Sequence, residues 1–448
     1  MSENFDPVAL ELAGSVLVEA SAGTGKTHAI TLLVLRLILE RELAPAEILV
    51  MTFTEAATAE LRVRIRRRLH QALEVLSGNP ASAAAADPDL LRICERHRDS
   101  ASLERLKRAV AELDEAPITT IHGFCHRVLH DHALRAGAPY GAELAKDLEE
   151  LDEDVIYDFW HRYVAELPEL FDLIPDPPLP RLRALLREVR RHPRARLVPD
   201  PMDALMELDR DFVQYARAEL DARKERQKVF GFDDLLGRVA EALAGQGGAD
   251  VATSLRSRFK AALVDEFQDT DPVQYEIVER VFASGGLPLF LIGDPKQAIY
   301  GFRGADVFTY LAAAGRARRA TMHVNWRSDP GLVTAVNTLF CPEHSFVFPE
   351  IRHPRIEPRP SVTDAFFAPT ASGGASLEIL QLEREKPEVA LPRANAEHQA
   401  PRVVAVEIAR LLAGGATIEG RPVRASDIAV LTRNNKQCFD VQDALRDL

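Results

Sequence analysis

Residues 16–27 read VLVEASAGTGKT, and this stretch decides the fold. It has the form of a buried strand, a loop of small residues and a helix start. The loop matches the pattern GxxxxGK[ST] with Ala20 in place of the first glycine, and its small residues let backbone N–H groups surround a phosphate. Lys26 is expected to bridge the β- and γ-phosphates of ATP, and Thr27 to hold Mg²⁺. The residues predicted to bind ATP here are Ala20, Ser21, Ala22, Gly23, Thr24, Gly25, Lys26 and Thr27.

A second apolar strand ends in two acids, in the run 259–266, FKAALVDE. In a parallel sheet the carboxyl end of a strand lies at the ligand-binding edge, beside the phosphate loop. Asp265 is therefore expected to hold Mg²⁺, and Glu266 to act as the base for an attacking water. Taken alone, a strand followed by two acids also fits a solvated strand end.

Short β-branched runs alternate with helical patterns along the chain, which predicts parallel βαβ units and an α/β sheet. The predicted strands are Ser15–Val18, Ile48–Phe53, Ile118–Ile121, Ala261–Val264 and Leu287–Ile292. The third and fourth of these strands are separated by far more chain than a crossover needs, which indicates an inserted helical subdomain. A last α/β segment is predicted, with a helix at Arg402–Leu412 and strands at Leu377–Leu382 and Ile428–Leu431.

Composition sets limits on the class of protein. The chain has 448 residues, of which 46% are hydrophobic and 27% charged, so it is not disordered as a whole. A net charge of −13 argues against binding nucleic acid by bulk charge, although local basic grooves remain compatible with it. The four cysteines form no CxxC pair, and the start has no signal-peptide pattern. A cytoplasmic protein without a membrane segment is expected.

Seven motifs follow one another over about residues 12 to 330. They are EASAGTGKT (19–27), MTFTEAAT (51–58), ITTIHGFC (118–125), GFDDLL (231–236), VDEFQDTD (264–271), GDPKQAIYGFRGA (293–305) and NWRS (325–328). By their content and order the chain resembles superfamily 1 DNA helicases of the UvrD/Rep type, and within them the helicase part of RecB. The resemblance implies a P-loop NTPase, or RecA-like, motor that uses ATP and Mg²⁺.

The resemblance also assigns roles to individual residues. It implies that Gln297 senses the γ-phosphate, that Trp326 stacks on adenine and that Arg327 reaches the γ-phosphate. The positions where relatives contact single-stranded DNA are Phe53, His122, Phe302 and Arg303. Aromatic platforms of this kind bind bases without sequence preference. Simpler interpretations remain open: His122 as a helix-capping or core residue, Phe302 as a core residue and Arg303 as half of a surface ion pair.

The implied domain organisation has four parts. Residues 1–127 and 229–320 form the first motor domain, residues 128–228 the helical insertion, and residues 321–448 part of a second motor domain. Two arginine-rich stretches, 62–68 and 181–196, fit either solvated surfaces or phosphate contacts. The chain lacks the family's GLE-type motif and its last, finger-like arginine, so it is expected to be the N-terminal part of a longer protein.

Three functions are compared. The leading one is an ATP-dependent 3′–5′ helicase or translocase acting in double-strand-break repair and recombination. The resemblance implies single-stranded and duplex-end DNA as substrates, and RecC- and RecD-like subunits as partners. The alternative is a truncated ATP- and DNA-binding remnant that unwinds nothing unless another polypeptide completes it. A small-molecule kinase would leave GDPKQAIYGFRGA and NWRS unexplained.

Overall fold

The structure is a computed structural model in which two compact units can be described. Unit 1 comprises residues 1–21 and 25–322, and unit 2 comprises residues 22–24 and 323–448. The structure describes residues 3–131, 143–144, 148–166, 178–191, 198, 203–299, 301, 306–341, 345–360, 362–369, 376–382 and 390–448.

Unit 1 is built on a seven-stranded sheet in the order β1-β9-β2-β8-β7-β3-β4, with every neighbouring pair parallel. Its strands are β1 (Glu3–Asn4), β2 (Ser15–Ala20), β3 (Ile48–Thr52), β4 (Ile118–Thr120), β7 (Ala261–Val264), β8 (Leu289–Gly293) and β9 (Arg318–Met322). All five strands predicted for this unit are confirmed, with ends that shift by up to two residues. The parallel α/β sheet is confirmed with them.

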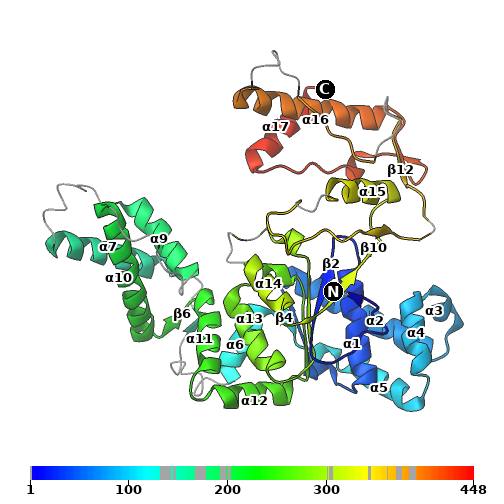
Figure 1. Ribbon diagram of the computed structural model, residues 1–448, viewed down its shortest axis with the longest axis horizontal. Coiled ribbons are helices and arrows are strands. Elements are labelled where there is room, and N and C mark those ends of the chain that lie inside the picture. Colours follow the sequence, from blue (N-terminus) through cyan, green and yellow to red (C-terminus); the bar gives the residue numbers. More distant parts are fainter. Residues whose placement is uncertain are drawn as a thin grey trace. The chain divides into compact units, whose positions relative to one another are not determined.

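Helices cover both faces of this sheet (Figure 1). One face packs on α1 (Lys26–Glu40), α2 (Glu55–Leu76), α4 (Pro88–Arg96) and α5 (Ser100–Ala111). The other face packs on α6 (Ile121–Asp131), α11 (Phe232–Ala244), α12 (Gly248–Arg258), α13 (Pro272–Val278) and α14 (Val307–Ala314). The short α3 (Pro80–Ala85) precedes α4.

The strand sequences explain why two cores form. In β2, Val16 and Val18 belong to the core under α1, whereas Leu17 belongs to the opposite core. Side chains alternate between the two faces along a strand, and a strand covered on both faces is therefore mostly apolar. The buried Arg36 ties α1 to the N-terminal segment, because its guanidinium donates to the carbonyls of Pro7 (2.9 Å) and Leu10 (2.7 Å). It also forms a bidentate pair with Glu40.

Three helices form a separate cluster within the segment where the sequence predicts an insertion: α7 (Glu149–Glu166), α9 (Leu179–Arg191) and α10 (Ala204–Gln227). Their contacts bury an aromatic and aliphatic core around Phe159 and Phe212, whose rings meet edge to face at 5.1 Å. Two short parallel strands, β5 (Glu143–Leu144) and β6 (Val229–Phe230), pair at the ends of this segment.

Unit 2 has a smaller core and shorter strands. Its helices are α15 (Pro330–Leu339), α16 (Arg393–Ala413) and α17 (Asn435–Arg446), and α16 contains the predicted helix at Arg402–Leu412. Its strands are β10 (Val324–Asn325), β11 (Glu357–Pro358), β12 (Phe366–Phe367), β13 (Thr417–Ile418) and β14 (Arg421–Pro422).

Two strand predictions in unit 2 were wrong. Residues 377–382 and 428–431 are not in strands, and Ile379 and Leu431 expose 82% and 95% of their surface. An apolar run becomes a strand only where a neighbouring strand satisfies its backbone. In the described part of unit 2, neither run has such a neighbour.

Candidate active site

The phosphate loop joins β2 to α1. Gly23 and Gly25 have φ angles of +79° and +95°, in the left-handed region that side chains disfavour. Gly25 is the N-cap of α1 and has no side chain that could cap the first N–H groups of the helix. An N-terminus of this kind is suited to binding an anion. Ala20 ends β2 and has no positive φ. Alanine at the first position of the pattern is therefore compatible with the loop, as the sequence predicts.

Lys26 lies at the start of α1 and contacts an acid 240 residues later in the chain. Its Nζ is 2.5 Å from Oε2 of Glu266, which follows β7 after one residue. The lysine side chain is 14% exposed and the glutamate 37%. Because all strands run parallel, the phosphate loop after β2 and the acids after β7 reach the same edge of the sheet. The structure thus brings together two predicted catalytic residues.

Asp265 directly follows β7, and its backbone N–H donates to the carbonyl of Met51 (2.9 Å). Its Oδ1 accepts from the backbone N–H of Glu266 (2.9 Å). Burial and the neighbouring charge of Glu266 raise the pKa of Asp265 to about 6. Two adjacent acids at a largely buried edge carry more negative charge than Lys26 alone balances. This donor set fits a hard divalent cation such as Mg²⁺.

The backbone of Glu266 is in the left-handed region, with a φ of +50°. A non-glycine residue there costs about 1 kcal/mol or more, and such strain concentrates at functional sites. The turn Phe267–Asp269 follows at once.

Gln268 links this turn to the loop after β8. Its amide nitrogen donates to Oε2 of Glu266 (2.9 Å), and its Oε1 accepts from the backbone N–H of Asp294 (3.0 Å). Gln297, the predicted phosphate sensor, donates its amide to Oδ2 of Asp294 (2.8 Å). No role for Gln268 is predicted from the sequence, although it lies in the motif VDEFQDTD (264–271).

A second charged network lies between the ends of β2 and β8. Lys296 contacts both Oδ1 of Asp294 (2.7 Å) and Oε1 of Glu19 (3.1 Å), and Arg319 reaches Oε2 of Glu19 (3.3 Å). Glu19, Lys296 and Asp294 are each at most 9% exposed. These ion pairs hold the strand before the phosphate loop against the loop that carries Gln297. The only local indication of these pairs is the unusual charge of Glu19 on a buried strand.

Two of the four residues expected to contact DNA, Phe53 and His122, lie in the described part of the chain. Phe53 is half-buried and lines a small cleft together with Ile121, Asp265 and Glu266. His122 is half-buried in the first turn of α6, next to Ile121. Phe302 and Arg303 lie outside the described residues.

Unit 2 contains the tip of the phosphate loop, Ala22–Thr24, as well as the NWRS motif. The backbone N–H of Trp326 donates to the carbonyl of Gly23 (2.8 Å), and the side-chain amide of Asn325 donates to the carbonyl of Ala22 (3.1 Å). A Cβ on Gly23 would lie 2.7 Å from Oδ1 of Asn325, so this approach requires glycine. The side chain of Trp326 is 58% exposed and Arg327 is also exposed.

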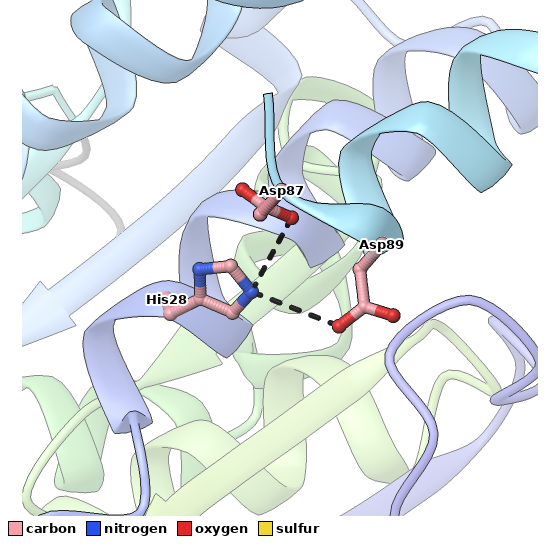
Figure 2. A group of neighbouring side chains, drawn as sticks. All are labelled: His28, Asp87 and Asp89. Carbon is pink, nitrogen blue, oxygen red and sulfur yellow. Dashed lines mark ion pairs between the residues drawn. The ribbon is translucent and has the colours of Figure 1, made fainter. Parts of the chain in front are cut away.

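A histidine beside the phosphate loop belongs to a different cluster. His28 Nε2 points between Asp87 Oδ1 (3.9 Å) and Asp89 Oδ2 (3.8 Å), as Figure 2 shows. Arg68 contacts both Asp87 and Nδ1 of the same ring. Since a guanidinium only donates, Nδ1 accepts and the ring proton is on Nε2, facing the carboxylates. That protonation leaves no lone pair for a cation, and the cluster serves to join α1, α2 and α4.

Three arginines in the described part of each arginine-rich stretch form ion pairs within the protein. On α2, the partners are Glu60 for Arg64, Asp114 for Arg66 and Asp87 for Arg68. On α9, the partners are Asp209 for Arg181, Glu153 for Arg183 and Asp152 for Arg190. Residues 192–196 lie outside the described part of the chain. These pairs favour the interpretation as structural surfaces over phosphate contacts.

None of the described helices would span a bilayer, since each is too short or too polar.

Comparisons with known proteins agree with the geometry. The sequence profile of the UvrD/REP helicase N-terminal domain matches residues 2–317. The RecBCD enzyme subunit RecB of Mycobacterium tuberculosis is 36% identical over 444 residues, which cover 97% of this chain and 39% of that protein. The same subunit of Escherichia coli K12 is 31% identical over 581 residues, covering 99% of this chain and 48% of that protein. The chain therefore spans less than half the length of these relatives. Because the family profile covers most of its residues, the chain belongs to the UvrD/REP helicase family.

Proposed function

We propose that this chain carries the motor of a 3′–5′ DNA helicase or translocase of the RecB/UvrD type. It would couple ATP hydrolysis to movement on single-stranded DNA in double-strand-break repair and recombination. The observation that carries the proposal is the contact between Lys26 and Glu266. It sets a phosphate-binding cation against a water-activating carboxylate at the ligand edge of a parallel sheet, as hydrolysis of a nucleoside triphosphate requires.

The contact also suggests how the site changes when ATP enters. Lys26 donates to Oε2 of Glu266, and the phosphates of a bound ATP would compete for the same ammonium group. Transfer of Lys26 to the phosphates frees that carboxylate oxygen to accept a proton from the attacking water. Thr27 and Asp265 would hold Mg²⁺, which supplies charge neutralisation at the phosphates when bound.

Roles for the remaining predicted residues are part of the same proposal. Gln297 would contact the γ-phosphate, Trp326 would stack on adenine and Arg327 would complete the site. DNA would follow Phe53 and His122 on unit 1, together with Phe302 and Arg303. The cleft that Phe53 shares with Asp265 and Glu266 supports this, because it puts a candidate base-stacking ring beside the hydrolysis site.

The partners and the domain division are proposed on the resemblance. The relatives are named as subunits of the RecBCD enzyme, and we propose that this chain acts with RecC- and RecD-like subunits on duplex ends. Residues 1–127 and 229–320 would form the first motor domain, 128–228 its insertion and 321–448 part of a second motor domain.

Strand displacement on tailed duplexes tests the proposal. The chain should unwind a duplex with a 3′ single-stranded tail, in the presence of Mg²⁺ and ATP, and leave a 5′-tailed duplex intact. Glu266→Gln is the matched inactive control, because it keeps the shape of the side chain and removes the base. Unwinding from 5′ tails would contradict the polarity. Binding of ATP and DNA without displacement of either duplex would favour the binding remnant instead.

A further inference from the structure

One buried amide bridges the two loops that carry the candidate base and the candidate phosphate sensor. Gln268 is 3% exposed and makes a hydrogen bond at each end of its side-chain amide. The partners fix which end is which, because the carboxylate of Glu266 accepts and the backbone N–H of Asp294 donates. Gln268 therefore has a defined orientation between the strand ends of β7 and β8.

The glycine at the end of β8 is what lets the two loops approach. A Cβ built on Gly293 would lie 2.6 Å from Oε1 of Gln268 and 3.0 Å from its backbone nitrogen. The φ of Gly293 is not positive, so the requirement is for space rather than for backbone freedom. Any larger residue would push against the amide of Gln268.

The bridge continues into the sensor loop. Asp294, whose backbone N–H is bound by Gln268, holds the amide of Gln297 with Oδ2 and contacts Lys296 with Oδ1. Glu266 and Gln297 are thus connected through two residues that are both buried. A continuous chain of hydrogen bonds therefore joins the Glu266 carboxylate to the loop 294–297.

We infer that Gln268 is a positioning residue that couples Glu266 to the loop Asp294–Gln297, with Gly293 providing the space for it. The inference rests on the proposed function. When Lys26 moves from Glu266 to the phosphates of ATP, Gln268 still donates a hydrogen bond to Oε2 of Glu266 and holds the carboxylate in its orientation. Because the same amide accepts from the backbone N–H of Asp294, the loop 294–297 responds to the change.

Hydrogen–deuterium exchange tests the bridge itself on the full chain. In Gln268→Met, which has a similar volume and no polar end, the amide of Asp294 should exchange faster. Gln268→Glu keeps an acceptor for this amide, so its protection should persist. Addition of Mg²⁺ and the non-hydrolysable analogue AMP-PNP should change exchange across 294–297 in the wild type and not in Gln268→Met. Unchanged protection of Asp294 in Gln268→Met would overturn the inference.

Steady-state hydrolysis tests its consequence. Both Gln268→Met and Gln268→Glu should lower kcat by about 10- to 100-fold, the equivalent of one hydrogen bond to a charged group, while KM for ATP changes little. Gly293→Ala should also lower kcat. The control is Gly237→Ala, where an added Cβ meets nothing within 4 Å and kcat should be unchanged.

The two failures are distinguishable. A wild-type chain that hydrolyses no ATP would count against the proposed function, and the exchange of Asp294 would still decide whether the bridge exists. Variants that raise KM and lower the melting temperature without lowering kcat would show that Gln268 only supports the fold.

Discussion

Replacing Asp265 with asparagine should stabilise the metal-free protein at pH 8, although it removes a proposed Mg²⁺ ligand. The pKa of this carboxyl is raised from 3.8 to about 6 by burial and by the charge of Glu266. A raised pKa means that the stability contributed by this group is fully present below about pH 4 and is lost as the pH rises through 6. At about 1.4 kcal/mol for each pKa unit, the cost at pH 8 is about 3 kcal/mol.

Thermal unfolding in EDTA measures this effect. The melting temperature of Asp265→Asn should lie several degrees above that of the wild type at pH 8 and should equal it near pH 4. Asp87→Asn is a control of opposite sign: burial alone would raise the pKa of Asp87, but hydrogen bonds from Leu90 and Arg68 outweigh it and lower the pKa. That variant should be less stable than the wild type at pH 8. An Asp265→Asn protein that gains no stability at pH 8, or gains equally at both pH values, would refute the reasoning.

Three further predictions concern other parts of the chain. Arg36→Met should lower the free energy of unfolding by about 3 kcal/mol, because it leaves buried carbonyls and a carboxylate unpaired. The control Arg64→Met, which removes an exposed i,i+4 ion pair, should lower it by less than about 1 kcal/mol. Urea unfolding measures both losses, and equal losses would contradict the prediction. A thiol reagent should label the exposed Cys438 rapidly and Cys94 slowly, since burial raises the pKa of Cys94 to about 11; mass spectrometry that finds both labelled at one rate would oppose this. Glu266→Gln should bind ATP as the wild type does and hydrolyse it about 10²- to 10⁴-fold more slowly, and a smaller loss would exclude Glu266 as the base.

Much of unit 1 could be predicted from its sequence because its signals are local. The strand Ile48–Thr52 and its neighbours are continuous apolar runs, and the pattern GxxxxGK[ST] is specific to phosphate-binding loops. Strand β9, which lies between β1 and β2, was not predicted, because its sequence Arg318–Met322 is partly charged. Its arginines are tolerated since they pair with Glu11 and Glu19.

What the sequence could not provide is the pairing of distant side chains. Nothing local indicates that Gln268 reaches Asp294 or that Lys296 reaches Glu19, because these contacts depend on β8 lying between β7 and β2 in the sheet. The strand predictions at the end of the chain failed for a related reason. Their apolar runs satisfy the local pattern, but a strand also needs a partner that the local pattern cannot supply.

The central claim is that the site around Lys26 and Glu266 hydrolyses ATP in response to single-stranded DNA. The direct measurement is the ATPase rate of the chain with and without an unstructured oligonucleotide, beside Lys26→Ala and the control Lys260→Ala, whose Nζ contacts a carbonyl on α12. DNA should stimulate hydrolysis in the wild type and in the control, and not in Lys26→Ala. Hydrolysis that persists in Lys26→Ala, or that ignores DNA in the wild type, would contradict it.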